Sequence, residues 1–357
     1  MKINLILFSL LLLLSTACSQ ANPPINDSTM DEIPPTNSDS PEKMLLVLSA
    51  PSIHDDYYAP AFDKIVAFQI AYAREIIGRD NVVVLVDQDT SPSYQRELPS
   101  DVLLVADVYD IWMRDFTTVN PDTPVQFTYT WASMTKRESE QVQRSFTALA
   151  DELGITREKT NLLLDGGNMV DNYNGNFVTT TRFMEDNGLD FEEAKETLRD
   201  LLHAKNVAIL EPDEEVLAHS DGMVSWIDTD VLAVNDYSFD PEFRALVLDE
   251  LNATFPDTKI VEVPVEYKTN APGEWEGFES ACGVNLNAVL TFKYLYVPTF
   301  NMTHDQQALE TIRQNTTKNV IPIDAQGVCG MGGSVRCLTW QVTGENAQKL
   351  ILAARQR

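Results

Sequence analysis

The chain has 357 residues, of which 44% are hydrophobic and 22% charged, enough apolar material for one large globular domain or two small ones. Its formal net charge of −28 argues against nucleic acid as a partner, because nothing would offset the repulsion of phosphates. Such a surface either attracts small cations or reflects a salty habitat.

The N-terminus has the pattern of an export signal. Lys2 precedes an apolar run over residues 3–14, and small residues follow that run. The run is too short to span a bilayer comfortably. We therefore expect a signal peptide over residues 1–17, with an uncleaved apolar N-terminus as the alternative.

Cys18 lies where the acylated cysteine of a bacterial lipoprotein would lie. The preceding Ala17 fits the lipobox of that class, although Ser15 stands where the box usually has Leu. Residues 18–43 are rich in Pro, Ser, Asn and Asp, which is typical of a flexible tether. We expect an exported lipoprotein of the cell envelope, attached to the membrane through a lipid on Cys18. Ser19 favours the outer membrane.

Short apolar runs alternate with amphipathic stretches from residue 44 onward, which predicts a single α/β or α+β domain over residues 44–357. Expected helices cover residues 60–77 (with Gly78 as the stop), 137–153, 190–204, 241–252 and 304–316. Expected strands cover residues 44–49, 82–86, 102–106, 175–181, 206–210, 222–227, 230–235, 259–263, 285–290, 293–298 and 319–323. A hairpin is expected to turn at residues 228–230.

Three cysteines remain for the exported domain once Cys18 is assigned to lipid: Cys282, Cys329 and Cys337. An odd number in an oxidising compartment leaves one unpaired thiol that invites a functional explanation. We suggest a Cys282–Cys329 disulfide and a free Cys337, a pairing that the sequence alone does not prove.

Several common catalytic signatures are absent from the sequence. It has no G-x-S-x-G, no H-E-x-x-H, no P-loop and no G-x-G-x-x-G, and its four histidines do not have metal-ligand spacing. A metalloenzyme or a nucleotide enzyme therefore has little support.

Four short segments contain the candidate functional residues. They are DIWMRD at 110–115, LDGGNM at 164–169, HSD at 219–221 and GGSVRCLT at 332–339. Each could be structural if taken alone: a core tryptophan beside an ion pair, a hairpin turn, a local hydrogen-bonded pair and an inert buried thiol. Together they fit one chemical task.

The ordered set W-x-R-D, [E/D]-G-G-N, H-x-D and G-G-x-x-x-C resembles the guanidine-modifying, or pentein, superfamily. Within it, the chain is most similar to the agmatine deiminases and the bacterial peptidylarginine deiminases. Segments 282–285 and 296–300 also resemble the stretch that those enzymes have before the cysteine. The resemblance covers roughly residues 44–350. It implies a pseudo-fivefold α/β propeller of ββαβ units around a central active site.

The resemblance also implies a reaction, the hydrolysis of a guanidinium group to a ureido product and ammonia without a cofactor or metal. Cys337 is the expected nucleophile, through a covalent thiouronium, and His219 the expected acid and then base. Asp115 and Asp221 would bind the N–H edges of the guanidinium, as paired carboxylates can. Asp165 would orient His219 or accept another N–H.

Trp112, Arg114 and Asn168 are further candidates for substrate binding, because they lie within the same motifs. The expected ligand is a small cationic guanidine or an arginine peptide. Because acidic neighbours oppose thiolate formation while a protonated His219 and the bound cation favour it, we expect a bell-shaped pH profile.

The sequence departs from the agmatine deiminases at two places, and both argue against agmatine itself as the substrate. Those enzymes generally have Glu where this chain has Asp165, and usually Gly-Pro where this chain has residues 116–118. Lys136 and Arg137 could contact a substrate carboxylate or could simply begin a solvated helix. An amidinotransferase and a non-catalytic lipoprotein that captures cationic ligands stay open as alternative functions.

Overall fold

The computed structural model describes residues 35–131, 134–270, 275 and 279–356. The predicted signal peptide and the lipid cysteine lie outside the described residues. Residues from Pro35 onward form one compact unit. The predicted domain start at residue 44 is therefore too late: Asn37, assigned to the tether, exchanges hydrogen bonds of 2.8 and 2.9 Å with the backbone of Val82. Its polar composition suggested a linker, but the amide completes the edge of a buried strand.

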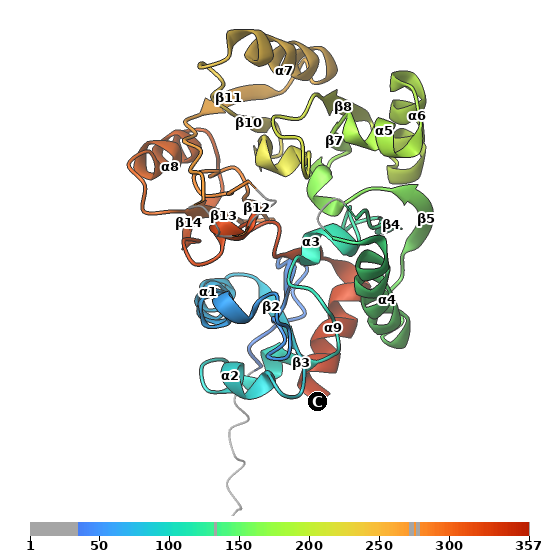
Figure 1. Ribbon diagram of the computed structural model, residues 1–357, viewed down its shortest axis with the longest axis vertical. Helices are drawn as coiled ribbons and strands as arrows, with labels where there is room; N and C mark the ends of the chain where they lie inside the picture. Colours follow the sequence, from blue (N-terminus) through green and yellow to red (C-terminus); the bar gives the residue numbers. More distant parts are fainter. Residues whose placement is uncertain (1–34, 132–133, 271–274, 276–278, 357) are drawn as a thin grey trace, which may run out of the picture. The chain divides into compact units, whose positions relative to one another are not determined.

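The described strands form five separate sheets (Figure 1). The first contains β15 (Trp340–Val342), β1 (Leu45–Ser49), β2 (Asn81–Val86) and β3 (Leu103–Val105). The second contains β4 (Val125–Thr128) and β5 (Glu158–Leu163). The third contains β6 (Val170–Asp171), β7 (Asn176–Thr180) and β8 (Asn206–Leu210). The fourth contains β9 (Val224–Asp228), β10 (Val231–Asn235) and β11 (Lys259–Val263). The fifth contains β12 (Val289–Leu290), β13 (Tyr294–Thr299) and β14 (Asn319–Asp324).

One unit recurs in these sheets, a parallel strand pair joined by a helical crossover, as parallel pairing requires. The crossovers are α1 (Phe62–Ile76) in the first sheet, α4 (Lys136–Glu152) in the second, α5 (Arg182–Asn187) with α6 (Phe191–Leu202) in the third, α7 (Pro241–Thr254) in the fourth and α8 (Asp305–Gln314) in the fifth. Except in the second sheet, an antiparallel strand pairs with the first strand of this unit. The short helices α2 (Ser91–Gln95) and α3 (Met113–Phe116) and the C-terminal α9 (Gly344–Gln356) lie outside these crossovers.

The predicted helices are confirmed as α1, α4, α6, α7 and α8, with their ends shifted by a few residues. Gly78, the predicted stop, follows α1 with a φ of +85°, which favours glycine. Capping boxes begin α4 and α6, at Thr135 with Glu138 and at Asp190 with Glu193. The predicted hairpin is confirmed as the antiparallel pair of β9 and β10.

The strand predicted over residues 285–290 is wrong for most of its length, because only Val289–Leu290 pair with a neighbour. Asn285 and Asn287 in this segment are buried, and their side-chain amides donate to the Pro298 carbonyl and to Cys337 Sγ. The strands β4, β5, β6 and β15 and the helices α2, α3, α5 and α9 were not predicted. In the part of the chain that the structure describes, no helix is both long and apolar enough to cross a membrane.

Candidate active site

The four motif segments meet at one place, and each contributes a turn outside a regular strand. Asp115 lies in the single-turn helix α3, and Asp165 and His219 each directly precede a 3-10 turn, Gly166–Asn168 and Ser220–Gly222. Cys337 comes shortly before β15, which pairs with the first strand of the domain. The pairing of β15 with β1 thereby brings Cys337 beside the segment of Asp115, more than 200 positions away in the sequence.

Two cavities of about 450 Å³ each adjoin at these residues. Leu217, His219, Gly332 and Cys337 line both. We call the cavity that also contains Trp112, Asp115, Asp165, Tyr57, Tyr58 and Tyr129 the Trp112 cavity. The other, which contains Asp221, Asn287, Asp213, Tyr237, Tyr267 and Glu279, is the Tyr267 cavity.

Cys337 is the free cysteine among the described residues, and Cys282 and Cys329 form a disulfide, as suggested from the sequence. Its Sγ accepts a hydrogen bond from Asn287 Nδ2 at 3.1 Å and lies 3.8 Å from Asp221 Oδ2. Burial, and then the charges of Asp221 and Asp115, raise the pKa of the Cys337 thiol well above its usual range. The thiol therefore needs a cation beside it to ionise near neutral pH.

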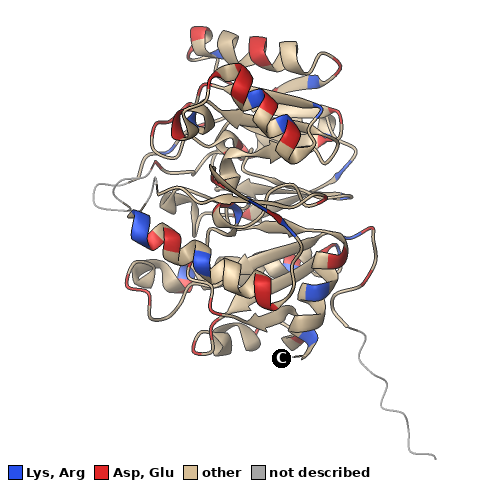
Figure 2. Ribbon diagram, turned by 90° about the vertical axis from the view of Figure 1, so that its right-hand side faces the viewer, with Lys and Arg blue, Asp and Glu red and all other residues tan. Residues whose placement is uncertain are grey.

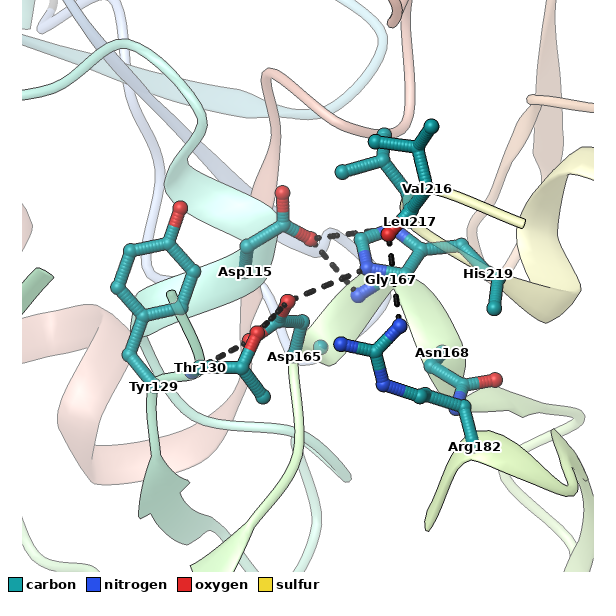
Figure 3. A network of polar contacts seen from close by, with 12 residues as sticks. Asp115, Tyr129, Thr130, Asp165, Gly167, Asn168, Arg182, Val216, Leu217 and His219 are labelled. Carbon is teal, nitrogen blue, oxygen red and sulfur yellow. Dashed lines mark hydrogen bonds and ion pairs between the residues drawn. The ribbon is translucent and has the colours of Figure 1, made fainter. Parts of the chain in front are cut away.

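His219 lies between two carboxylates (Figure 3). Its Nε2 is 3.4 Å from Asp165 Oδ2, and its Nδ1 is 3.9 Å from Asp115 Oδ1. Burial alone would lower the pKa of His219, but Asp115 and then Asp165 outweigh that effect and raise it to about 9. The imidazole is therefore protonated at neutral pH and can donate a proton.

Asp165 is held from behind by Thr130, which follows β4. Its Oδ1 accepts from the Thr130 backbone N–H at 2.8 Å and its Oδ2 from the Thr130 hydroxyl at 2.6 Å (Figure 3). A carboxylate with both oxygens engaged cannot turn freely. Of the two roles considered for Asp165, this arrangement favours the orientation of His219.

Asp115 accepts a hydrogen bond of 2.9 Å from the Gly167 backbone N–H. Burial raises the pKa of Asp115 to about 7; His219 opposes this rise, and Asp165 and Asp221 add to it. A Cβ on Gly167 would lie 2.4 Å from His219 Nδ1 and 2.8 Å from Asp115 Oδ1. Glycine at position 167 is therefore what allows the imidazole and this carboxylate to approach the turn so closely.

Asp221 forms an ion pair with Arg336 that the motif analysis missed. Arg336 Nη1 donates to Asp221 Oδ2 at 2.8 Å, and Nη2 donates to the Met169 carbonyl at 2.6 Å. The side chains of Arg336 and Asp221 are 6% and 2% exposed. Burial would lower the pKa of Arg336, but Asp221 raises it above its usual value. The pair fixes the carboxylate that lies nearest the thiol.

Asn287 is the second residue that the sequence analysis missed. Its Oδ1 accepts from the Ser334 hydroxyl at 2.9 Å, from Arg336 N at 3.0 Å and from Cys337 N at 3.3 Å, while its Nδ2 donates to the thiol. Its place inside a predicted strand concealed it. Arg336 could have been noticed, because it directly precedes the candidate nucleophile.

The remaining motif residues differ in their positions. Trp112 lines the Trp112 cavity, but Arg114 and Asn168 line neither large cavity. Arg114 is buried and donates to Gln341 Oε1 at 2.5 Å, and Asn168 Oδ1 accepts from the backbone N–H groups of Thr180 and Ser220. Arg114 and Asn168 therefore hold the motif turns in place rather than facing either of these two cavities.

Neither cavity is lined by Lys or Arg among the described residues. Lys136 and Arg137 are the exposed first residues of α4, which agrees with a solvated helix start. Residues 132–133, 271–274 and 276–278, outside the description, include no Lys or Arg in their sequence. By contrast, five described carboxylate side chains line each cavity. In the described ranges no group of three His, Cys, Asp or Glu side chains could hold a metal ion.

Comparison with known proteins was made by sequence and by structure. Residues 38–343 match the family model described as Porphyromonas-type peptidyl-arginine deiminase. No curated protein matches the chain by sequence. The structure is similar to agmatine deiminase of C. jejuni, with 19% identity, a TM-score of 0.71 and coverage of 85% of this chain and 94% of that chain. Agmatine deiminase of Enterococcus faecalis gives 16% identity, a TM-score of 0.67 and coverage of 87% and 95%. The domain thus has the α/β fold of these proteins.

Proposed function

Because the chain belongs to the Porphyromonas-type peptidyl-arginine deiminase family of hydrolases acting on C–N bonds, we propose that it hydrolyses the guanidinium group of a small cation through a covalent intermediate on Cys337. One observation carries the proposal. The Cys337 thiol, the His219 imidazole and the carboxylates Asp115, Asp165 and Asp221 all lie at the junction of the two cavities.

The substrate cation completes the charge balance of the site. Asp115 and Asp221 accept hydrogen bonds from the N–H edges of the guanidinium, which places its carbon beside Sγ. The bound positive charge offsets the carboxylates that oppose ionisation, so the pKa of the Cys337 thiol falls when substrate binds. The site therefore forms its nucleophile only when a cation is present.

His219 moves the protons. The thiolate attacks the guanidinium carbon, the C–N bond to the terminal nitrogen breaks, and His219 donates the proton with which ammonia leaves. The neutral imidazole then takes a proton from water, which attacks the thiouronium carbon. The C–S bond breaks, and the ureido product and the thiol are released. Asp165, held by Thr130, keeps the imidazole oriented and favours its charged form.

The charge of the cavities favours agmatine-type guanidines over free arginine or peptides that end in arginine. A substrate carboxylate near the guanidinium would meet further carboxylates and no described cationic side chain except His219. Asp165, in the place of the usual Glu, was a reason to doubt that agmatine is the substrate. Its side chain bonds to His219 and Thr130, so it acts behind the substrate. Its length is therefore no argument against agmatine.

The decisive experiment is a guanidine panel that contains agmatine, free arginine, N-acyl arginine and peptides with internal or terminal arginine. Ammonia and ureido product are measured with the purified protein and with the Cys337→Ser variant. We expect turnover of agmatine, weaker or no turnover of substrates with a nearby carboxylate, and none with Cys337→Ser. Retained turnover in Cys337→Ser, or failure of every substrate together with an unreactive thiol, would overturn the proposal. Added primary amines that become amidinated in place of hydrolysis would instead indicate an amidinotransferase.

We further propose that the five sheets are the blades of a pseudo-fivefold propeller. The recurrence of the helix-linked parallel pair in each sheet supports this arrangement. Export as a lipoprotein, in the outer membrane where the cell has one, is proposed from the residues around Cys18. Labelling of cells with an alkyne-bearing fatty acid should mark the protein, and the Cys18→Ser variant should lose the label.

A further inference from the structure

The junction of the two cavities gives the thiol two open sides. Asp115 lines the Trp112 cavity alone and Asp221 lines the Tyr267 cavity alone, whereas Cys337 and His219 line both. A planar guanidinium held between Asp115 and Asp221 therefore presents one nitrogen edge to each cavity. A guanidine with one substituent occupies one cavity and leaves the other without a substrate group.

The Tyr267 cavity is larger than the proposed hydrolysis requires. Besides the guanidine and its ureido product, the reaction consumes only water and releases only ammonia, and a water molecule takes up about 30 Å³ of liquid volume. The cavity has about 450 Å³. Its size therefore suits an organic group that extends from the guanidinium.

The lining of the Tyr267 cavity suits a cationic alkyl group. Tyr237 and Tyr267 both donate their hydroxyls to Asp213 Oδ2, at 2.7 and 2.9 Å, so the phenol rings are fixed around a half-buried carboxylate. Phe239, 67% exposed, packs edge-to-face against Tyr267 with ring centroids 6.3 Å apart. Glu279 adds a further carboxylate to the lining. Aromatic faces beside carboxylates attract alkylammonium groups.

We propose that the Tyr267 cavity binds a second, cationic alkyl arm of the substrate, and that the protein therefore also hydrolyses N,N′-disubstituted guanidines with release of an alkylamine. The first arm lies in the Trp112 cavity, beside its aromatic side chains. This inference rests on the proposed function of Cys337.

The reaction balances in the same two steps. The thiolate bonds to the guanidinium carbon, the C–N bond to the arm in the Tyr267 cavity breaks, and His219 protonates the leaving nitrogen. Water then gives up a proton to His219 and adds to the thiouronium carbon, and the C–S bond breaks. The overall products are a monosubstituted urea and an alkylammonium ion.

The test compares agmatine with N,N′-bis(4-aminobutyl)guanidine, a symmetric probe in which either arm can leave. Release of 1,4-diaminobutane and 4-aminobutylurea is followed by mass spectrometry. Two variants reverse one charge each: Glu279→Lys in the Tyr267 cavity and Asp55→Lys in the Trp112 cavity, a matched control. We expect Glu279→Lys to lower the ratio of kcat/KM for the probe to kcat/KM for agmatine about tenfold, and Asp55→Lys to change that ratio less than about twofold.

Three outcomes would contradict the inference or its basis. Turnover of agmatine without turnover of the probe would overturn the inference and leave the proposed function intact. If the probe is turned over but Glu279→Lys leaves the ratio of the two kcat/KM values unchanged, the second arm does not bind in the Tyr267 cavity. Failure of both substrates would count against the proposed function itself.

Discussion

The charge of single residues at the thiol should set the pH range of activity. Asp115 must be ionised to bind the guanidinium, and its pKa is about 7, so kcat/KM should fall as the pH decreases through 7. His219 must be protonated to donate, and its pKa is about 9, so kcat/KM should also fall as the pH rises through 9. Initial rates at low agmatine concentration should trace a bell between these limits. A flat or monotonic profile would contradict the assigned roles.

Asp165 should act through His219, so its replacement has a signature that a structural role would not have. Asp165→Asn removes one of the two negative charges beside the imidazole, which lowers the pKa of His219. The alkaline limb of the profile should move to lower pH, and kcat should fall about 10²- to 10⁴-fold, the usual range for positioned proton transfer.

The matched control for Asp165 is Thr130→Val, which keeps the carboxylate and its charge. That variant loses the hydroxyl bond of 2.6 Å to Asp165, while the Thr130 backbone N–H still donates to the carboxylate. We expect a smaller loss of kcat and an alkaline limb at its original pH. An equal displacement of the limb in both variants would show that the charge of Asp165 is not the cause.

Arg336 should contribute to the free energy of unfolding, a role that the sequence motifs do not indicate. Arg336→Met leaves the buried Asp221 carboxylate without its ion-pair partner, which costs about 3–5 kcal/mol when one member of such a pair is removed. Denaturant titration followed by circular dichroism should report this loss in the free energy of unfolding. The double variant Arg336→Met/Asp221→Asn should recover much of it, because no buried charge is then unpaired. A double variant as unstable as the single one would rule out the unpaired charge as the cause.

At the scale of elements, the disulfide joins two segments that reach the site. Cys282 follows Ala281, which lines the Tyr267 cavity, and Cys329 begins the 3-10 turn that leads to Gly332. The cysteines are 47 residues apart in sequence, and closing a loop of that length stabilises a fold by about 4 kcal/mol in the chain-entropy model.

The Cys282→Ala/Cys329→Ala variant should therefore have a free energy of unfolding lower by about 2–4 kcal/mol. Denaturant titration should show this decrease, and the wild type titrated in reducing agent should show a similar one. Gln348→Ala, at an exposed position of α9, is the control, and its free energy of unfolding should be close to that of the wild type. An unchanged midpoint in the double variant would show that the cross-link does not stabilise the domain.

Elements with clear periodicity were predictable, and those specified by distant partners were not. The helix α4 follows from its apolar spacing and its capping box, both local features. The strand β5 reads as EKTNLL, which is too polar to be recognised, and it forms because it pairs in parallel with β4. Segment 285–290 shows the reverse case. The sequence predicted a strand there, but Asn287 Oδ1 accepts hydrogen bonds from residues 334–337 instead.

The site shows the same division. Asp115, Asp165, His219, Asp221 and Cys337 were predicted because family motifs surround them, and the structure brings all five to one junction. Arg114 and Asn168 belong to the same motifs yet face inward, since a motif does not reveal which way a side chain points. Asn287 acts through contacts that exist only once the chain is folded, so no local pattern indicates it, whereas the position of Arg336 directly before Cys337 was a local signal.

At the scale of the whole molecule, the excess of acidic residues should matter for substrate capture. The chain has 54 Asp and Glu against 26 Lys and Arg, and Figure 2 shows acidic positions on many of the helices and loops. A negative potential of this extent raises the local concentration of small cations and their rate of encounter. Salt weakens that attraction, because the Debye length falls from about 10 Å at 0.1 M to about 3 Å at 1 M.

We therefore expect kcat/KM for agmatine to fall several-fold between low salt and 1 M salt, with kcat changing little, because salt screens the approach of the cation more than the buried chemistry. Initial rates over a range of agmatine concentrations at each ionic strength separate the two constants. The rate at which uncharged iodoacetamide alkylates Cys337 is the control, and it should depend far less on salt. If alkylation and kcat/KM fell in parallel, salt would be acting on the thiol or on the fold, and long-range attraction would not be the explanation.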